Sequence, residues 1–221
     1  MIVQEFTFPE RNLHYFVGLG SLITNTSKFD DIFELLDSIQ NQFENCMIQF
    51  FNKKLVLNSN HIFYACYHTL RSFQLKTNIS NKMGIEFLLY LSANRQIRKA
   101  LKYYGITKEN VNQEQIAFCI ISLTKNLDLI LTEILNLINA TETKLNLDKE
   151  SIIRYENIKN FFEINDDQLI TVLKSHRINI NNIIPNRNNI TQLNLAIEDL
   201  IAEKMVLLSL ERTQEEGHSK E

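Results

Sequence analysis

The sequence predicts an α+β protein in which one domain holds a small mixed or antiparallel sheet covered by several helices. Two observations predict this class: short β-rich runs are separated by amphipathic helical segments rather than paired as hairpins, and several helical segments follow the last clear strand. No linker rich in Pro, Gly or Ser and no internal repeat divides the chain. We therefore expect a single domain over residues 1–212 and a charged, disordered tail over 213–221.

Three runs rich in β-branched and aromatic residues predict strands at residues 12–18, 46–51 and 116–122. The first run ends at Gly18, and Gly20 follows two residues later. This pair lacks the third glycine and the lysine of a phosphate-binding loop, so we interpret Gly18 to Ser21 as a tight turn.

Apolar residues recur at helical spacing between and after these strands. Helices are predicted over residues 29–43, 60–74, 83–92, 94–104, 126–139, 151–162, 166–175 and 192–210. Asn58 and Ser59 offer an N-terminal cap for the second helix, and Asn165 offers one for the seventh. Gly105 stands where a C-cap glycine belongs. Residues 176–191 are Asn-rich and lack a helical period, so we expect an irregular surface excursion there.

Composition is that of a soluble globular protein, with 44% hydrophobic and 22% charged residues. No segment reaches the ~18 consecutive apolar residues that span a bilayer. The N-terminal segment lacks the basic and apolar regions of a signal peptide, so we expect a cytoplasmic protein with no membrane partner. Cys46, Cys66 and Cys119 are widely spaced and are expected to be buried thiols in a reducing compartment.

Charge is unevenly distributed along the chain. The window 71–108 holds eight Lys or Arg and a single acid, Glu86, so its net charge is +7, whereas the whole chain carries −3. A basic region on an acidic body is typical of proteins with an anionic partner. The alternative is a solvated helix face that happens to be basic.

No catalytic or metal-binding pattern stands out. The chain has no P-loop, dinucleotide-binding, nucleophile-elbow or zinc-protease motif and no CxxC pair. His61 and His68 could share a helix face, but we interpret them as partners of backbone or water rather than as metal ligands. Two aspartate pairs, at 30–31 and 166–167, are interpreted as helix-start residues. We expect no metal, no cofactor and no enzymatic activity.

One stretch, residues 85–101, is harder to explain as scaffold. We expect Arg95 and Gln96 in the first turn of the 94–104 helix, where free backbone N–H groups, a guanidinium and an amide suit a phosphate or a nucleotide edge. In the alternative interpretation Glu86 pairs with Arg95 and Gln96 only caps the helix. The same helix is expected to turn three apolar side chains inward and its basic ones outward. The inward set is Ile97, Ala100 and Leu101; the outward set is Arg95, Arg98, Lys99 and Lys102.

This stretch resembles the signature of the small KEOPS subunit family, known in human cells as PRPK-binding protein. The residues that carry the resemblance are His61, Ala65, Asn78, Lys82, Glu86, Ser92, Arg95, Gln96, Ile97, Ala100, Gly105 and Ile106. The segments 158–169 and 197–210 are also similar to the family, so the resemblance covers most of the chain from about residue 58 onward. Two departures are Asn94, near the place of a family glycine, and residues 176–191, which look like an insertion.

The resemblance implies a non-catalytic KEOPS subunit that binds an atypical kinase/ATPase subunit and, through it, the threonylcarbamoyl transferase subunit. It also implies recruitment of tRNA by its 3′ CCA end for threonylcarbamoyl-adenosine (t6A) modification. We expect tRNA contacts at Arg71, Lys82, Arg95, Gln96 and Lys99, with Arg98 and Lys102 secondary, and a kinase interface at Met205, Leu207 and Leu208. Two other hypotheses are a purely structural or allosteric activator of the kinase without RNA binding and, ranked last, an enzyme acting on a small anion.

Overall fold

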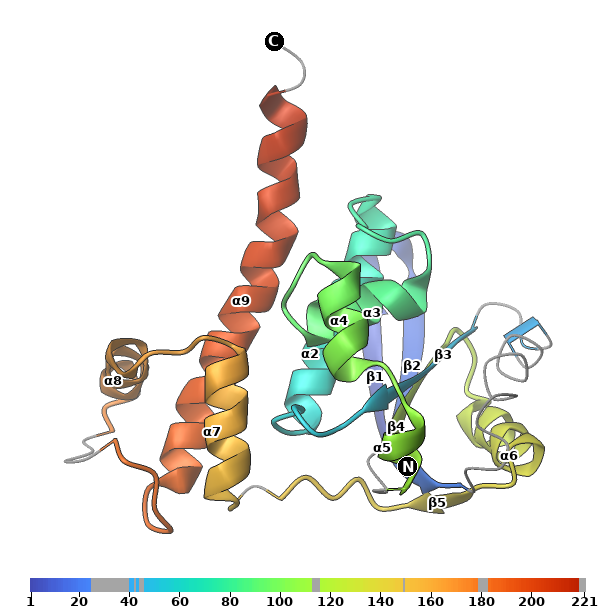
Figure 1. Cartoon of the computed structure of the whole chain (residues 1–221). Coiled ribbons are helices and arrows are strands. Elements are labelled where there is room, and N and C mark those ends of the chain that lie inside the picture. Colours follow the sequence, from blue (N-terminus) through green and yellow to red (C-terminus); the bar gives the residue numbers. More distant parts are fainter. Residues whose placement is uncertain are drawn as a thin grey trace. The chain divides into compact units, whose positions relative to one another are not determined.

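The chain forms two compact units, seen in a computed structural model (Figure 1). The first comprises residues 1–53 and 104–146, and the second comprises residues 54–103 and 147–221. The structure describes residues 1–24, 40–41, 43, 46–112, 116–148, 150–178 and 183–218, so most of the predicted 29–43 helix and the Asp30–Asp31 pair lie outside the described residues. The predicted α+β class is confirmed, and the single-domain organisation stays a prediction.

The first unit is built on an antiparallel sheet. Its strands, taken from the described residues, are β1 (Ile2–Phe8), β2 (Leu13–Ile23), β3 (Cys46–Asn52), β4 (Ile116–Ser122) and β5 (Thr141–Thr143). The order is β1-β2-β4-β3, and β5 pairs with the far end of β2. The strands predicted from residues 46 and 116 are confirmed. Strands β1 and β5 were not predicted: β1 is mostly exposed and does not alternate regularly between apolar and polar residues, and β5 has three residues.

The turn predicted at Gly18 to Ser21 is wrong, because both glycines lie within β2. The strand runs straight through Gly18 and Gly20, and neither glycine has a positive φ. A Cβ on Gly20 would collide with the ring of Phe118 on β4, and one on Gly18 would lie 2.5 Å from the Met1 Sδ atom. The glycines therefore make room for neighbouring side chains within the sheet. The reversal between β1 and β2 lies earlier, in the 3-10 turn Pro9–Arg11 and the left-handed residue Asn12.

Helix α6 (Leu127–Leu137) packs on one face of this sheet (Figure 1). Every second residue of a strand points to the same face, so one set of strand side chains meets the helix. Its buried contacts include Leu22, Ile48, Phe50, Ile116, Phe118 and Ile120 from the strands, with Leu127, Ile130, Leu131 and Ile134 from the helix. A short helix, α5 (Lys108–Asn112), also belongs to this unit.

The second unit is helical. Its described helices are α2 (Ser59–Leu75), α3 (Met83–Leu91), most of α4 (Ile97–Tyr104), α7 (Ile152–Phe161), α8 (Asp166–Ser175) and α9 (Ile190–His218). Helices α2, α3, α7 and α8 all contact α9, whose stripe from Leu193 to Leu208 is buried. The predicted caps are confirmed at Asn58, whose side chain accepts from the His61 N–H, and at Asn165, which forms a capping box with Gln168.

Helix α9 departs from its predicted bounds at both ends. It begins at Ile190 and its backbone stays helical past Leu210 to His218, which includes most of the segment expected to be a disordered tail. Residues 219–221 lie outside the described residues, as do 179–182 within the predicted excursion. The described remainder of that excursion before Ile190 has no helix, and Asn189 closes its last turn by accepting the Asn186 N–H.

None of the helices in the described part of the chain combines the length and the hydrophobicity needed to cross a bilayer. The three cysteines are free thiols. Cys66 and Cys119 are buried as expected, whereas Cys46 is only partly buried, and its burial raises the pKa of its thiol.

Candidate nucleic-acid interface

The connection between α2 and α3 is organised by a buried carboxylate. Glu86, in the first turn of α3, has no exposed surface. Its Oε2 atom accepts hydrogen bonds from the backbone N–H groups of Ile79 (2.9 Å) and Ser80 (2.7 Å). Its Oε1 atom accepts one from the Ser72 hydroxyl on α2 at 3.2 Å. These three partners were not predicted from the sequence, where Arg95 was the partner considered for Glu86.

Two lysines flank this connection. Lys76 ends α2 in the left-handed conformation (φ 58°), and Lys82 is the N-cap residue of α3. Both are exposed. Between them, the Ser80 hydroxyl accepts the Lys82 N–H at 3.2 Å, and the Asn78 amide donates to the Ser80 carbonyl at 3.0 Å. The sole acid of the basic window is therefore turned inward while two of its lysines face solvent.

Arg71 lies on the exposed side of α2, one turn before that connection. Its Nη1 atom donates to the Tyr67 hydroxyl at 3.3 Å. His68 stacks on Tyr90 with ring centroids 5.5 Å apart. Burial and, to a smaller extent, the positive charge of Arg71 together lower the pKa of His68 to about 4, so this histidine is neutral at pH 7.

The turn before α4 differs from the prediction. Helix α4 begins at Ile97, so Arg95 and Gln96 precede it instead of forming its first turn. Asn94 was noted at the place of a family glycine, but the left-handed residue is its neighbour Ala93 (φ 43°). The Asn94 side chain instead accepts the Gln96 N–H at 2.9 Å, which removes that group from the free donors expected there. Arg95 is half-buried and Gln96 is exposed.

Helix α4 buries less than its apolar pattern suggested. Ala100 is fully buried, but Ile97 and Leu101 are each 42% exposed, which corrects their predicted inward orientation. Ala100 and Tyr104 are both fully buried. They lie one turn apart, so the buried face of α4 is narrow. Gly105 follows the last residue of α4, but it lacks the positive φ of a left-handed C-cap.

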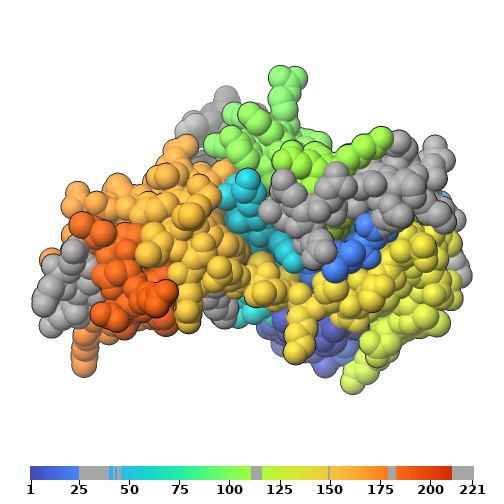
Figure 2. Space-filling view, turned by 60° about the horizontal axis from the view of Figure 1, so that its bottom comes forward, coloured from blue at the N-terminus to red at the C-terminus, as the bar shows by residue number. Residues whose placement is uncertain are grey.

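The basic side chains of α4 are solvent-facing, as predicted. Arg98 and Lys102 are exposed. The Lys99 Nζ atom lies 4.0 Å from the exposed carboxylate of Glu163, a contact worth little in water. Figure 2 shows the green segment around residue 100, which includes α4, at the molecular surface.

A hollow of about 390 Å³ lies between this turn and α9. Arg95 and Gln96 line one side, and Lys204, Leu207 and Leu208 line the other. The lining therefore combines two cationic side chains with two leucines. Lys204 was missed by the sequence analysis, because it lies far along the chain from the basic window and no local pattern marks it.

The three residues proposed for a kinase interface differ in how much of their surface is exposed. Met205 has no exposed surface and belongs to the buried stripe of α9, and its role at a kinase interface stays a prediction. Leu208 is 5% exposed, whereas Leu207 is 48% exposed. The hollow brings Leu207 and Leu208 together with Arg95 and Gln96, although the two pairs were expected to serve different partners.

His61 has a structural environment. The Leu57 N–H donates to its Nδ1 atom at 3.1 Å, and its Nε2 atom pairs with the Leu91 carbonyl at 2.9 Å. Complete burial, opposed by the bond to the Leu91 carbonyl and helped by nearby Arg154, lowers the pKa of His61 to about 4. The interpretation of His61 as a partner of backbone groups is confirmed. Among the described residues, no group of three His, Cys, Asp or Glu side chains could hold a metal ion.

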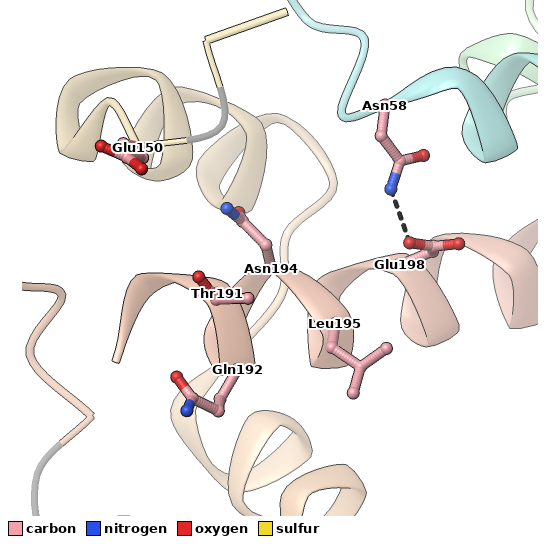
Figure 3. A pocket seen from close by; sticks show the side chains of 7 residues that line it. All are labelled: Asn58, Glu150, Thr191, Gln192, Asn194, Leu195 and Glu198. Carbon is pink, nitrogen blue, oxygen red and sulfur yellow. Dashed lines mark hydrogen bonds between the residues drawn. The ribbon is translucent and has the colours of Figure 1, made fainter. Parts of the chain in front are cut away.

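A second hollow, of about 440 Å³, lies beside the start of α9 (Figure 3). Its lining includes Asn58, Gln192, Asn194 and Glu198. The Glu198 carboxylate accepts the Asn58 amide at 2.5 Å and the Asn60 amide at 2.7 Å. These bonds join the first turn of α2 to α9, so the polar groups here have an evident role in packing.

The fold and this surface define a small α+β protein in which seven of the eight cationic residues of the basic window lie on α2, α4 and the connections around α3. Comparison with known proteins places the chain more narrowly. It belongs to the kinase binding protein CGI-121 family, whose model matches residues 24–209.

Among curated proteins, the chain is similar to the EKC/KEOPS complex subunit CGI121 of Candida albicans. The two are 27% identical over 108 residues, which cover 48% of this chain and 51% of that protein. The matched stretch thus spans about half the length of the curated relative. The resemblance drawn from the sequence is confirmed at the level of the family.

Proposed function

We propose that this chain is a non-catalytic KEOPS subunit that binds the kinase/ATPase subunit and recruits tRNA by its 3′ CCA end for t6A modification. One observation carries the RNA part of the proposal. The single acid of the basic window, Glu86, is withdrawn into the interior, so the side chains that this window offers to solvent are cationic or neutral.

The chemistry of this surface suits single-stranded RNA. Lys82, Arg71, Arg98 and Lys102 are exposed and can meet phosphates. The hollow beside Arg95 and Gln96 adds an amide, a planar guanidinium and apolar side chains, against which an unpaired base can stack or bond. We add Lys204 to the expected RNA contacts, because it lines the same hollow from α9.

Kinase binding is supported by the family description, and membership of the KEOPS complex by the name of the Candida albicans relative. The second half of α9 offers an apolar surface for it: Val206, Leu207 and Leu210 are 43%, 48% and 52% exposed. Exposed aliphatic side chains on a helix can form the apolar centre of a protein interface. Through the kinase, the chain would reach the transferase subunit.

A purely structural or allosteric activator of the kinase is the second candidate. It is favoured by the family description, which refers to kinase binding alone, and by the net charge of −3. In that case the basic surface is only a solvated face. Salt separates the two candidates: RNA binding through phosphates weakens steeply with salt, whereas an apolar kinase interface does not.

The test is binding of the purified protein to intact tRNA and to the same tRNA without its CCA end, each at 50 and 200 mM salt. We expect binding that requires the CCA end and weakens by at least about tenfold at the higher salt. Kinase binding at both salts is the internal control. Equal affinity for the two RNAs would contradict CCA recognition, and no binding to either would favour the activator.

A further inference from the structure

We propose that Glu86 is a positioning residue for RNA binding: its buried carboxylate fixes the α2–α3 connection so that Lys76 and Lys82 meet phosphates in a preset geometry. This inference rests on the proposed function and deepens it. It assigns a role to an acid that is buried within the basic window, where a negative charge would ordinarily oppose RNA.

The connection depends on this carboxylate for much of its order. Residues 76–82 contain no helix or strand. Successive backbone N–H groups at Ile79 and Ser80 both point at Glu86 Oε2, and Ser72 ties Oε1 to the last turns of α2. A second layer of bonds builds on Ser80, whose hydroxyl accepts the Lys82 N–H and whose carbonyl accepts the Asn78 amide. The position of Lys82 therefore follows from the anchoring of Ser80.

Preset geometry strengthens binding because less conformational entropy is lost when the ligand arrives. Hydrogen bonds to a buried carboxylate are also stronger than neutral ones, since the acceptor is charged. Glu86 can thus hold the connection from inside while adding no acidic group to the surface. Its negative charge still weakens phosphate binding by Coulomb's law, so the two effects of this residue oppose one another.

Because the two effects oppose one another, the direction of the change in tRNA affinity distinguishes them. Glu86→Gln removes the charge and replaces one accepting oxygen by an amide that cannot accept an N–H. If Glu86 acted only through its charge, the variant would bind tRNA more tightly than the wild type. If Glu86 positions the connection, tRNA binding weakens, and we expect about fivefold or more, because hydrogen bonds to a charged acceptor are lost.

The matched control is Glu163→Gln, which removes the same charge from an exposed side chain near Lys99. We expect unchanged or slightly tighter tRNA binding for it. Amide hydrogen exchange of the folded variants gives a second readout: Ile79 and Ser80 should exchange faster in Glu86→Gln and unchanged in Glu163→Gln. Affinity equal to or above wild type in Glu86→Gln would overturn the inference.

Glu86→Asp covers the case in which the Gln variant does not fold. It keeps the charge and shortens the side chain by one methylene, so we expect weakened tRNA binding with the same local increase in exchange. Wild-type affinity in Glu86→Asp despite faster exchange at residues 79 and 80 would again overturn the positioning role. A wild-type protein that does not bind tRNA would overturn the proposed function and this inference together, which is a distinct result.

Discussion

The two ends of α2 are held by carboxylates in contrasting ways. At the N-terminal end, Glu198 of α9 accepts two side-chain amides, from Asn58 and Asn60, and all three residues are partly or fully exposed. At the C-terminal end, Glu86 of α3 is fully buried and accepts two backbone N–H groups and a hydroxyl. Water can replace the partners of Glu198, whereas two of the three partners of Glu86, Ser72 and Ser80, are buried.

This difference indicates different roles for two residues of the same chemical type. A partly exposed bond between side chains adds modest packing specificity, because its loss leaves groups that can be solvated. A buried carboxylate bonded to main chain fixes the path of the backbone, because its loss strands polar groups in the interior. The end of α2 that carries the basic connection is therefore the more rigidly determined one.

The largest expected effect is a loss of folding stability when the buried carboxylate at the C-terminal end of α2 is removed. Glu86→Ala should lower the free energy of unfolding by about 4 kcal/mol, since it strands two backbone N–H groups and leaves a cavity. Urea denaturation followed by circular dichroism measures the change. A loss below about 1 kcal/mol would show that the connection rearranges without cost and that Glu86 does not fix it.

The next effect depends on pH. The pKa of His61 is about 4 in the folded protein and 6.5 in the unfolded chain, so below pH 6.5 the unfolded state binds more protons. Stability is therefore complete above pH 6.5 and falls toward pH 4, by roughly 3 kcal/mol for a shift of this size. His68 contributes in the same direction.

Denaturation at several pH values between 4 and 7 checks this dependence. His61→Gln should reduce the slope without removing it, because His68 remains. His14→Gln, a change at an exposed histidine of the first unit, should leave the slope due to His61 and His68 intact. An unchanged slope in His61→Gln would mean that His61 does not couple folding to pH.

The smallest effect is expected at the exposed end of α2. Glu198→Ala should cost about 1 kcal/mol or less, because water can replace the carboxylate as acceptor of the Asn58 and Asn60 amide N–H groups, and the Asn58 side-chain oxygen Oδ1 still caps α2. The same denaturation experiment applies. A cost as large as that of Glu86→Ala would remove the contrast between the two ends.

Local sequence signals predicted most elements of the described fold. Helix α8 matched its predicted bounds because its cap, its acidic first turn and its apolar period all agree. Strand β4 matched because every residue is buried and β-favouring or small. The turn predicted at Gly18 failed because the space requirement that selects glycine comes from Phe118, a residue on another strand.

The sequence predicted which basic residues the candidate site contains, but it did not predict how they are arranged in space. The basic window could be counted from the sequence, and Lys82, Arg71 and Arg98 are exposed as a binding role requires. The partners of Glu86 could not be predicted, because they are backbone groups of an irregular connection. Lys204 joins the hollow only through the packing of α9, and Met205 next to it turns into the core.

Charge reversal within the basic surface gives the decisive measurement. Arg95→Glu and Lys174→Glu change the net charge equally, but Lys174 is exposed on α8 and outside the basic window. With both variants shown to be folded by thermal denaturation, tRNA affinity is measured at low salt. We expect Arg95→Glu to weaken binding by at least about 30-fold and Lys174→Glu to leave it near the wild-type value. An unchanged tRNA dissociation constant for Arg95→Glu, or equal losses in the two variants, would contradict RNA binding at this surface.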